Sequence, residues 1–222
     1  MKLCGDRTAL AAATKFGSDG SGGKHSRDPR LRMCGAGVAV LGDTELGPTI
    51  VGGLSSSVCG SQTVPRAELT AVCLILSIAT ASLITIVVDA IYIIKGADRG
   101  PKNISNYANP DLWGRFWELI RGRGGIKTVR FIKIKSHLTP IEVACGVAPL
   151  DEVVLNEGAG AFAAASAKAS APSLRTTSSR GATPQATSIG VRWDLILIKR
   201  TVFIPPLPLM SSQNRPQRSG LA

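Results

Sequence analysis

The sequence predicts an α/β domain in which a mixed five-stranded sheet is flanked by helices, followed by a disordered C-terminal tail. Three observations support this. Apolar residues make up 44% of the 222 residues but aromatic residues only 5%, so aliphatic side chains must build the core. Strand-like and helix-like segments alternate over residues 1–170. Beyond them, up to residue 190, the chain is mostly Ser, Thr, Ala, Pro and Arg.

The first three strands are expected at residues 13–18, 35–41 and 48–54. The first of them leads into the glycine-rich turn at 19–23, and a Gly-Asp-Thr-Glu turn separates the second from the third. A short connection such as the second one typically joins neighbouring antiparallel strands. This part of the chain is therefore predicted to form an antiparallel meander.

A run of uncharged residues, 69–88, is long enough to suggest a transmembrane helix. Its first half is rich in Leu and Ala, which favour helix, whereas residues 83–88 are mostly β-branched. The acidic residues Glu68 and Asp89 bracket the run. We therefore expect a buried helix from residue 67 to about residue 80, followed by a central strand of a parallel sheet. A membrane span is the competing interpretation.

Three further elements complete the domain. Residues 111–120 have the apolar period of a helix, and its Trp113 and Trp117 are expected to pack rather than to stack on bases. Residues 129–135 alternate basic and apolar side chains, which predicts a half-exposed fifth strand. An alanine-rich helix is expected at 155–168.

The predicted domain boundary lies at residue 170. Residues 171–222 are expected to be a low-complexity, largely disordered basic tail, in which 193–204 has the pattern of a short strand or hairpin. We assign this tail no function.

The formal charge of +11 favours a polyanionic partner, such as nucleic acid or an anionic membrane surface. The five cysteines are an odd number, with no Cys-x-x-Cys pair and no histidine at zinc spacing. We interpret them as reduced thiols of an intracellular protein, nuclear or cytoplasmic. Asp6 and Arg7 interrupt the N-terminal apolar run, so a secretory signal is not expected.

Three carboxylates occupy positions typical of a metal site on a sheet. Asp19 follows a strand, Glu68 opens a helix, and Asp89 ends the buried strand. A charged group at the end of an apolar strand is costly unless it is paired or binds a metal. Taken singly, Asp19 and Glu68 also fit the caps of a turn and a helix.

Five motifs follow one another along the chain, and the first three contain these residues. The five are Ser18–Gly23, Arg66–Leu69, Val87–Ile94, Ile134–His137 and Asn156–Gly160. They resemble the Thr-Asp-Gly-Ser, Arg-x-Glu-Leu, Thr-Asp-Ser-x-Tyr-Val-Ile, Val-Lys-Gly-His and Asn-Glu-x-Ala-Asp segments of the type 1 ribonuclease H family, particularly the domain carried by retroelements. The resemblance implies the three-layer ribonuclease H-like fold.

In that family four carboxylates hold two Mg²⁺ ions, and RNA paired to DNA is cleaved. The resemblance implies that Asp19 bridges the two ions, with Mn²⁺ as an alternative metal. Glu68 and Asp89 would complete the site of one ion. His137 would lie on a loop and assist proton transfer or product release.

The last motif departs from the family, because Gly160 stands where the fourth aspartate is usual. Asp19 would then be the only protein carboxylate for the second ion. Glu157, three residues earlier on the predicted helix, is a candidate substitute. Ala90 also replaces the usual serine, and the link at 138–155 is longer than usual.

An RNA·DNA hybrid is the expected partner, and no membrane contact is expected; the oligomeric state is left open. The candidate nucleic-acid contacts are Lys24, Arg27, Arg30, Arg66 and Asn156, with His25 and Arg32 nearby and a second basic cluster at Arg121, Arg123, Lys127 and Arg130. For either cluster the alternative is a solvated basic face. We expect a hybrid-cleaving hydrolase impaired by Gly160, or an inactive nucleic-acid-binding remnant of a retroelement ribonuclease H domain.

Overall fold

The structure is a computed structural model that describes residues 1–45 and 47–171. Apart from Ala171, the predicted tail, including the hairpin pattern at 193–204, lies outside the described residues. The strands are β1 (Lys2–Cys4), β2 (Lys15–Ser21), β3 (Gly35–Thr44), β4 (Gly47–Ser57), β5 (Ile84–Val88) and β6 (Val129–Lys133). The helices are α1 (Arg7–Ala12), α2 (Val64–Ile78), α3 (Ile91–Arg99), α4 (Pro110–Gly122), α5 (Pro140–Ala144) and α6 (Leu150–Ser170), with 3-10 turns at Ile104–Asn106 and Ile126–Thr128.

The strands form one mixed sheet in the order β1-β4-β3-β2-β5-β6. The pairs from β1 to β2 are antiparallel, as the predicted meander requires, and β2, β5 and β6 are parallel. The mixed sheet is therefore confirmed, but the expected count of five strands is wrong by one. The extra strand, β1, pairs Lys2–Cys4 with the edge of β4 and is too short for a periodic pattern.

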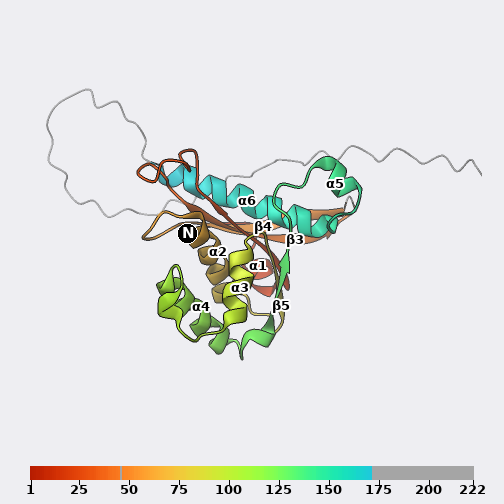
Figure 1. Cartoon of the computed structure of the whole chain (residues 1–222). Helices are drawn as coiled ribbons and strands as arrows, with labels where there is room; N and C mark the ends of the chain where they lie inside the picture. The colour runs from red at the N-terminus through yellow and green to blue at the C-terminus, as the bar shows by residue number, and fades with distance from the viewer. Residues whose placement is uncertain (46, 172–222) are drawn as a thin grey trace, which may run out of the picture. The chain divides into compact units, whose positions relative to one another are not determined.

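The sheet is the middle of three layers. The helix α6 crosses one face, and α2, α3 and α4 cover the other (Figure 1). The core lies between sheet and helices and includes Phe16, Ile86 and Trp113, each of which is fully buried. Trp113 and Trp117 pack edge-on against Phe116, which confirms their predicted packing role. This arrangement is the predicted three-layer fold.

The uncharged run at 69–88 contains two elements rather than one. The helix α2 begins after Thr63, whose side chain accepts a hydrogen bond from the Arg66 N–H, and ends at Ile78. The strand β5 then lies inside the sheet, between β2 and β6. In the part of the chain that the structure describes, no helix is long and apolar enough to cross a membrane.

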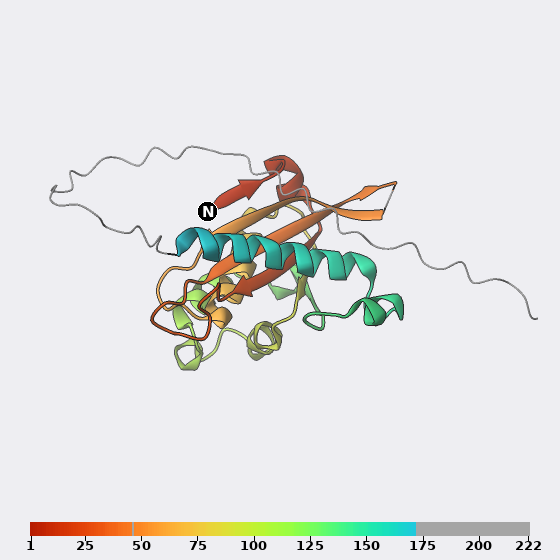
Figure 2. The same cartoon turned by 90° about the horizontal axis from the view of Figure 1, so that it is seen from above.

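The last helix is longer than predicted, because α6 begins at Leu150 rather than at residue 155. Part of the long link before it is helical too, since Thr139 and Glu142 form a capping box that starts α5. Alanines at 159, 163 and 167 are buried at four-residue intervals along α6. These small side chains let the helix lie close to β2, β3 and β4, across which it runs in Figure 2.

Candidate metal centre

The structure brings Asp19, Glu68 and Asp89 together. Each offers one carboxylate oxygen, and the three oxygens lie within 4.8 Å of one another. Asp19 lies on β2, Glu68 in the first turns of α2, and Asp89 directly after β5. Residues that follow one another at separations of 49 and 21 positions thus form one acidic group, which is the convergence that the sequence predicted.

The parallel pairing of β2 and β5 accounts for half of this geometry. Ser18 pairs with Val88, so the residues that follow them, Asp19 and Asp89, emerge side by side at the same edge. The backbone N–H of Gly20 donates to Asp19 Oδ1 over 2.7 Å. A Cβ at residue 20 would lie 2.6 Å from the backbone nitrogen of Glu68. Only glycine there lets α2 start close enough to place Glu68 beside the two aspartates.

The acidic group is electrostatically unfavourable by itself. Burial, and then the charges of Asp19 and Asp89, raise the pKa of Glu68 to about 10. Burial, and then the charge of Asp89, raise the pKa of Asp19 to about 6. Glu68 is only 5% exposed, and its buried Oε2 has no hydrogen-bond partner. A cation would neutralise this repulsion, and three carboxylate oxygens are ligands that Mg²⁺ and Mn²⁺ prefer. The donors therefore fit one divalent ion.

Gly160, on α6, lies next to the Asp19 carboxylate. A Cβ at residue 160 would be only 2.7 Å from Asp19 Oδ2, so the Asp19 carboxylate would have to shift to admit a side chain there, and a carboxylate at this position would adjoin the group. Glu157 does not replace it, because its side chain is exposed and it is not a member of the acidic group. If Glu68 and Asp89 hold the first ion, a second ion beside Asp19 would find no further carboxylate of this group among the described residues.

The segment after β6 carries the candidate histidine to the same edge. His137 is exposed and has a left-handed backbone with φ of 52°. It is close enough to the acidic group for its charge to lower the pKa of Asp19, although burial outweighs this effect. Its neighbour Ser136 donates a hydrogen bond from Oγ to Asp89 Oδ2 over 2.7 Å. Sequence reasoning missed this contact, because nothing in the pattern marks Ser136 as a partner of Asp89.

The predicted nucleic-acid contacts differ in their surroundings. Lys24, Arg27 and Arg30 are exposed in the loop after β2, at the same edge as the acids, and Arg30 pairs with Asp28. Asn156 lies one turn before Gly160 on α6, and its buried Oδ1 has no hydrogen-bond partner.

Arg66 has a different environment from these residues. Its side chain is 12% exposed and binds both oxygens of Asp111 at the start of α4. It also donates to the backbone carbonyl of Cys59. In this structure the Arg66 guanidinium therefore joins α2 to α4.

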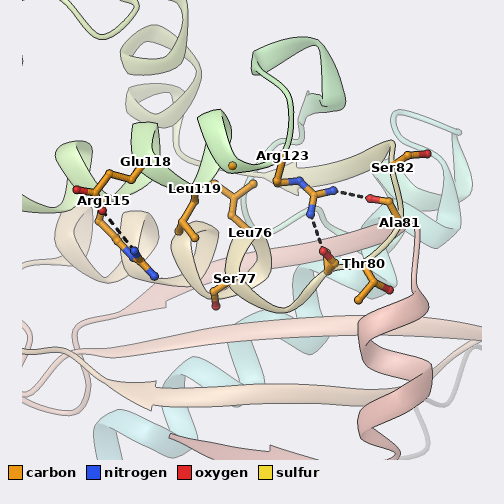
Figure 3. A pocket seen from close by; sticks show the side chains of 11 residues that line it. Leu76, Ser77, Thr80, Ala81, Ser82, Arg115, Glu118, Leu119 and Arg123 are labelled. Atoms are coloured by element: carbon orange, nitrogen blue, oxygen red, sulfur yellow. Dashed lines mark hydrogen bonds and ion pairs between the residues drawn. The ribbon is translucent and has the colours of Figure 1, made fainter.

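The second basic cluster lies away from the acids. Arg123 donates to the carbonyl oxygens of Ala79 and Ala81 just after α2, beside a hollow of about 420 Å³ (Figure 3). This hollow lies at the C-terminal end of α2, whereas Glu68 lies at its N-terminal end. Lys127 and Arg130 line another hollow, where β5 and β6 begin. Neither hollow includes an acidic residue of the candidate metal centre.

No protein-family model and no curated protein sequence matches this chain. Solved structures do. The chain is similar to the RNase H domain of PFV, with 15% identity, a TM-score of 0.52, and coverage of 72% of this chain and 98% of that domain. It is also similar to a foamy viral protease-reverse transcriptase in complex with dsDNA, with 18% identity, a TM-score of 0.50, and coverage of 72% and 97%. These similarities confirm that the fold is ribonuclease H-like.

Proposed function

We propose that this ribonuclease H-like chain is a divalent-metal-dependent endonuclease for the RNA strand of RNA·DNA hybrids, and that glycine at position 160 impairs it. The observation that carries the proposal is the acidic group, in which three carboxylates from separate elements lie within 4.8 Å at one sheet edge. Mg²⁺ is the proposed ion, with Mn²⁺ as an alternative.

The acidic group and the residues around it each have a role in this proposal. Asp19, Glu68 and Asp89 would hold the ion, which when bound stabilises charge on a phosphate and lowers the pKa of a bound water. His137 is exposed beside them and would carry a proton to or from the reacting groups. The nearby loop, which contains Lys24, Arg27, Arg30 and their basic neighbours, would contact the phosphates of the hybrid.

A nucleic-acid partner is supported by the charge and by one similar structure. The chain carries a formal charge of +11, and the foamy viral neighbour was solved in complex with dsDNA. We propose an RNA·DNA hybrid as the partner of this chain, and no membrane. We also propose a reducing compartment, nuclear or cytoplasmic, because all five cysteines are free thiols. Fluorescence microscopy of the tagged chain tests the compartment, and secretion would contradict it.

A second candidate function is binding without cleavage. Gly160 favours it, because in the described chain the side of Asp19 that faces α6 has no carboxylate. Such a module would bind hybrids in a salt-sensitive way but would not turn them over.

Cleavage of a labelled hybrid by the full chain in Mg²⁺ or Mn²⁺ separates these functions. The endonuclease proposal predicts RNA fragments from the hybrid but none from the same RNA in single-stranded form. Asp89→Asn removes one charged ligand and is expected to abolish cleavage. A folded protein that binds the hybrid but releases no fragment in either metal would support the binding module instead.

The role of Gly160 is tested by Gly160→Asp, with Gly160→Ala as the matched control. Both variants add a Cβ near Asp19 and remove a helical glycine, but only the first adds a carboxylate. We expect Gly160→Asp to raise the cleavage rate by more than about 10-fold, since even indirect metal partners contribute that much. Equal rates in both variants would show that the missing carboxylate does not limit activity.

A further inference from the structure

We propose that Ser136 is a positioning residue of the acidic group, which holds the Asp89 carboxylate in a fixed orientation and His137 beside it. The inference rests on the proposed metal-dependent function. Its basis is the hydrogen bond of 2.7 Å from Ser136 Oγ to Asp89 Oδ2, which joins two segments 47 residues apart.

Ser136 is the one side chain in the described chain that donates a hydrogen bond to Asp89. The next residue, Ala90, cannot donate such a bond because an alanine side chain has no hydroxyl. It caps α3 without a side-chain hydrogen bond. Relative to the motifs that this sequence resembles, a hydroxyl is therefore missing at 90 and an additional one is present at 136. The hydroxyl partner of the Asp89 carboxylate therefore comes from the loop that carries His137.

The loop around Ser136 is anchored on both sides. Before it, Ile134 is 3% exposed, and its N–H donates to the carbonyl of Val88 over 2.9 Å. After it, Thr139 and Glu142 form the capping box of α5, and Glu142 also pairs with Lys135. Between these anchors the Ser136 hydroxyl adds a third attachment, directly before His137. The left-handed backbone of His137 is thus held by attachments on both sides.

The chemical consequence concerns the orientation of one carboxylate. With Oδ2 bonded to Ser136, rotation of the Asp89 carboxylate is restricted. Partners that orient a ligand in this way typically contribute 10- to 100-fold to metal affinity. Without the hydroxyl, Asp89 must be ordered by the ion itself, so we expect weaker binding.

Titration of the full chain with Mn²⁺ tests the proposal without an activity readout. Calorimetry and electron paramagnetic resonance measure the Mn²⁺ affinity. We expect Ser136→Ala to weaken Mn²⁺ binding about tenfold, with Ser136→Gly equally affected. Ser136→Thr keeps the hydroxyl and should bind as the wild type does. Ser77→Ala is the matched control, because Ser77 is an exposed serine that donates only to the Leu74 carbonyl on α2.

The outcomes distinguish this inference from the function on which it rests. Wild-type affinity in both Ser136→Ala and Ser136→Gly would overturn the positioning role and leave the metal centre standing. An equal loss in Ser136→Thr would also overturn it, because the hydroxyl would then not be the cause. No Mn²⁺ binding by the wild-type chain would overturn both proposals. An unfolding measurement without metal shows whether each variant is folded. If Ser136→Ala does not fold, the Mn²⁺ affinities of Ser136→Thr and Ser136→Gly test the positioning role.

Discussion

Glu68 is a buried carboxyl group that the fold places beside two others. Its pKa is raised from 4.5 to about 10, first by burial and then by Asp19 and Asp89. Between these pH values the folded chain keeps a proton that the unfolded chain has released. The free energy of unfolding of the metal-free protein should therefore fall as the pH rises. The raised pKa of Asp19 acts in the same direction up to about pH 6.

We expect Glu68→Gln to stabilise the metal-free chain and to flatten this pH dependence, because an amide has no proton to lose. Urea unfolding in a chelator, between about pH 5 and pH 8, measures both effects. Glu118→Gln is the control, since Glu118 is exposed and only pairs with Arg115. A wild-type chain that becomes more stable over this pH interval would contradict the burial of an uncompensated carboxyl group.

Arg66 joins α2, the helix that carries Glu68, to the start of α4. Its guanidinium binds both carboxylate oxygens of Asp111, a geometry that a lysine ammonium cannot reproduce. We expect Arg66→Lys to lower the free energy of unfolding by about 1 kcal/mol. Thermal unfolding measures this loss, and Arg115→Lys should be nearly silent because its pair with Glu118 is exposed. Equal stability of the two variants would show that the bidentate pair is dispensable.

The sequence reveals the charged residues of the site more readily than their partners. Asp19, Glu68 and Asp89 can be identified because each interrupts an otherwise apolar or glycine-rich segment. The partners Ser136 and Asp111 lie 47 and 45 residues from the groups that they bind. Polar residues in loops and at helix starts are common, so no local pattern distinguishes these two. Only the folded arrangement identifies them.

At the scale of elements, α6 determines how close position 160 lies to Asp19. Ala163 is fully buried one turn further along α6, where the helix packs on the sheet. We expect Ala163→Leu to overpack this interface and to cost about 1–3 kcal/mol. Ala165→Leu is the matched control, because residue 165 is exposed on the same helix. Urea unfolding of the two variants measures the difference.

The same pair of variants also tests whether the packing of α6 on the sheet contributes to Mn²⁺ binding by the acidic group. A helix that is pushed away from β2 and β3 should change the surroundings of Asp19, so Ala163→Leu should weaken Mn²⁺ binding more than Ala165→Leu does. If Ala163→Leu is as stable as its control, the close packing of α6 on the sheet is refuted.

Elements with a strong apolar period are predictable from the sequence, and short ones are not. The helices α2 and α4 and the strands β5 and β6 lie within a few residues of their predicted positions. The elements that were not predicted are α3, with nine residues, and β1, α1 and α5, with three, six and five residues. The last three contain less than two helical turns or two strand repeats. Their existence depends on the tertiary contacts that they make.

At the scale of the whole molecule, basic residues lie at both ends of the parallel strands. Lys24 and Arg27 are exposed in the loop after β2, at the end where Asp89 follows β5. Lys127 and Arg130 are exposed at the opposite end, where Ile84 pairs with Val129. Net charge alone attracts a polyanion equally to both ends. A bound hybrid with its phosphates near the acids would use only the first pair.

Two double variants of equal charge separate these cases. We expect Lys24→Gln with Arg27→Gln to weaken hybrid binding and to reduce the slope of log affinity against log salt by about 2, or roughly 1 per lost phosphate contact. Lys127→Gln with Arg130→Gln changes the net charge by the same amount but should leave most of the slope intact. Fluorescence anisotropy over a salt series measures both slopes. Equal losses in the two variants would mean that the whole surface attracts the hybrid, because a seated hybrid distinguishes the two ends of the sheet whereas the net charge does not.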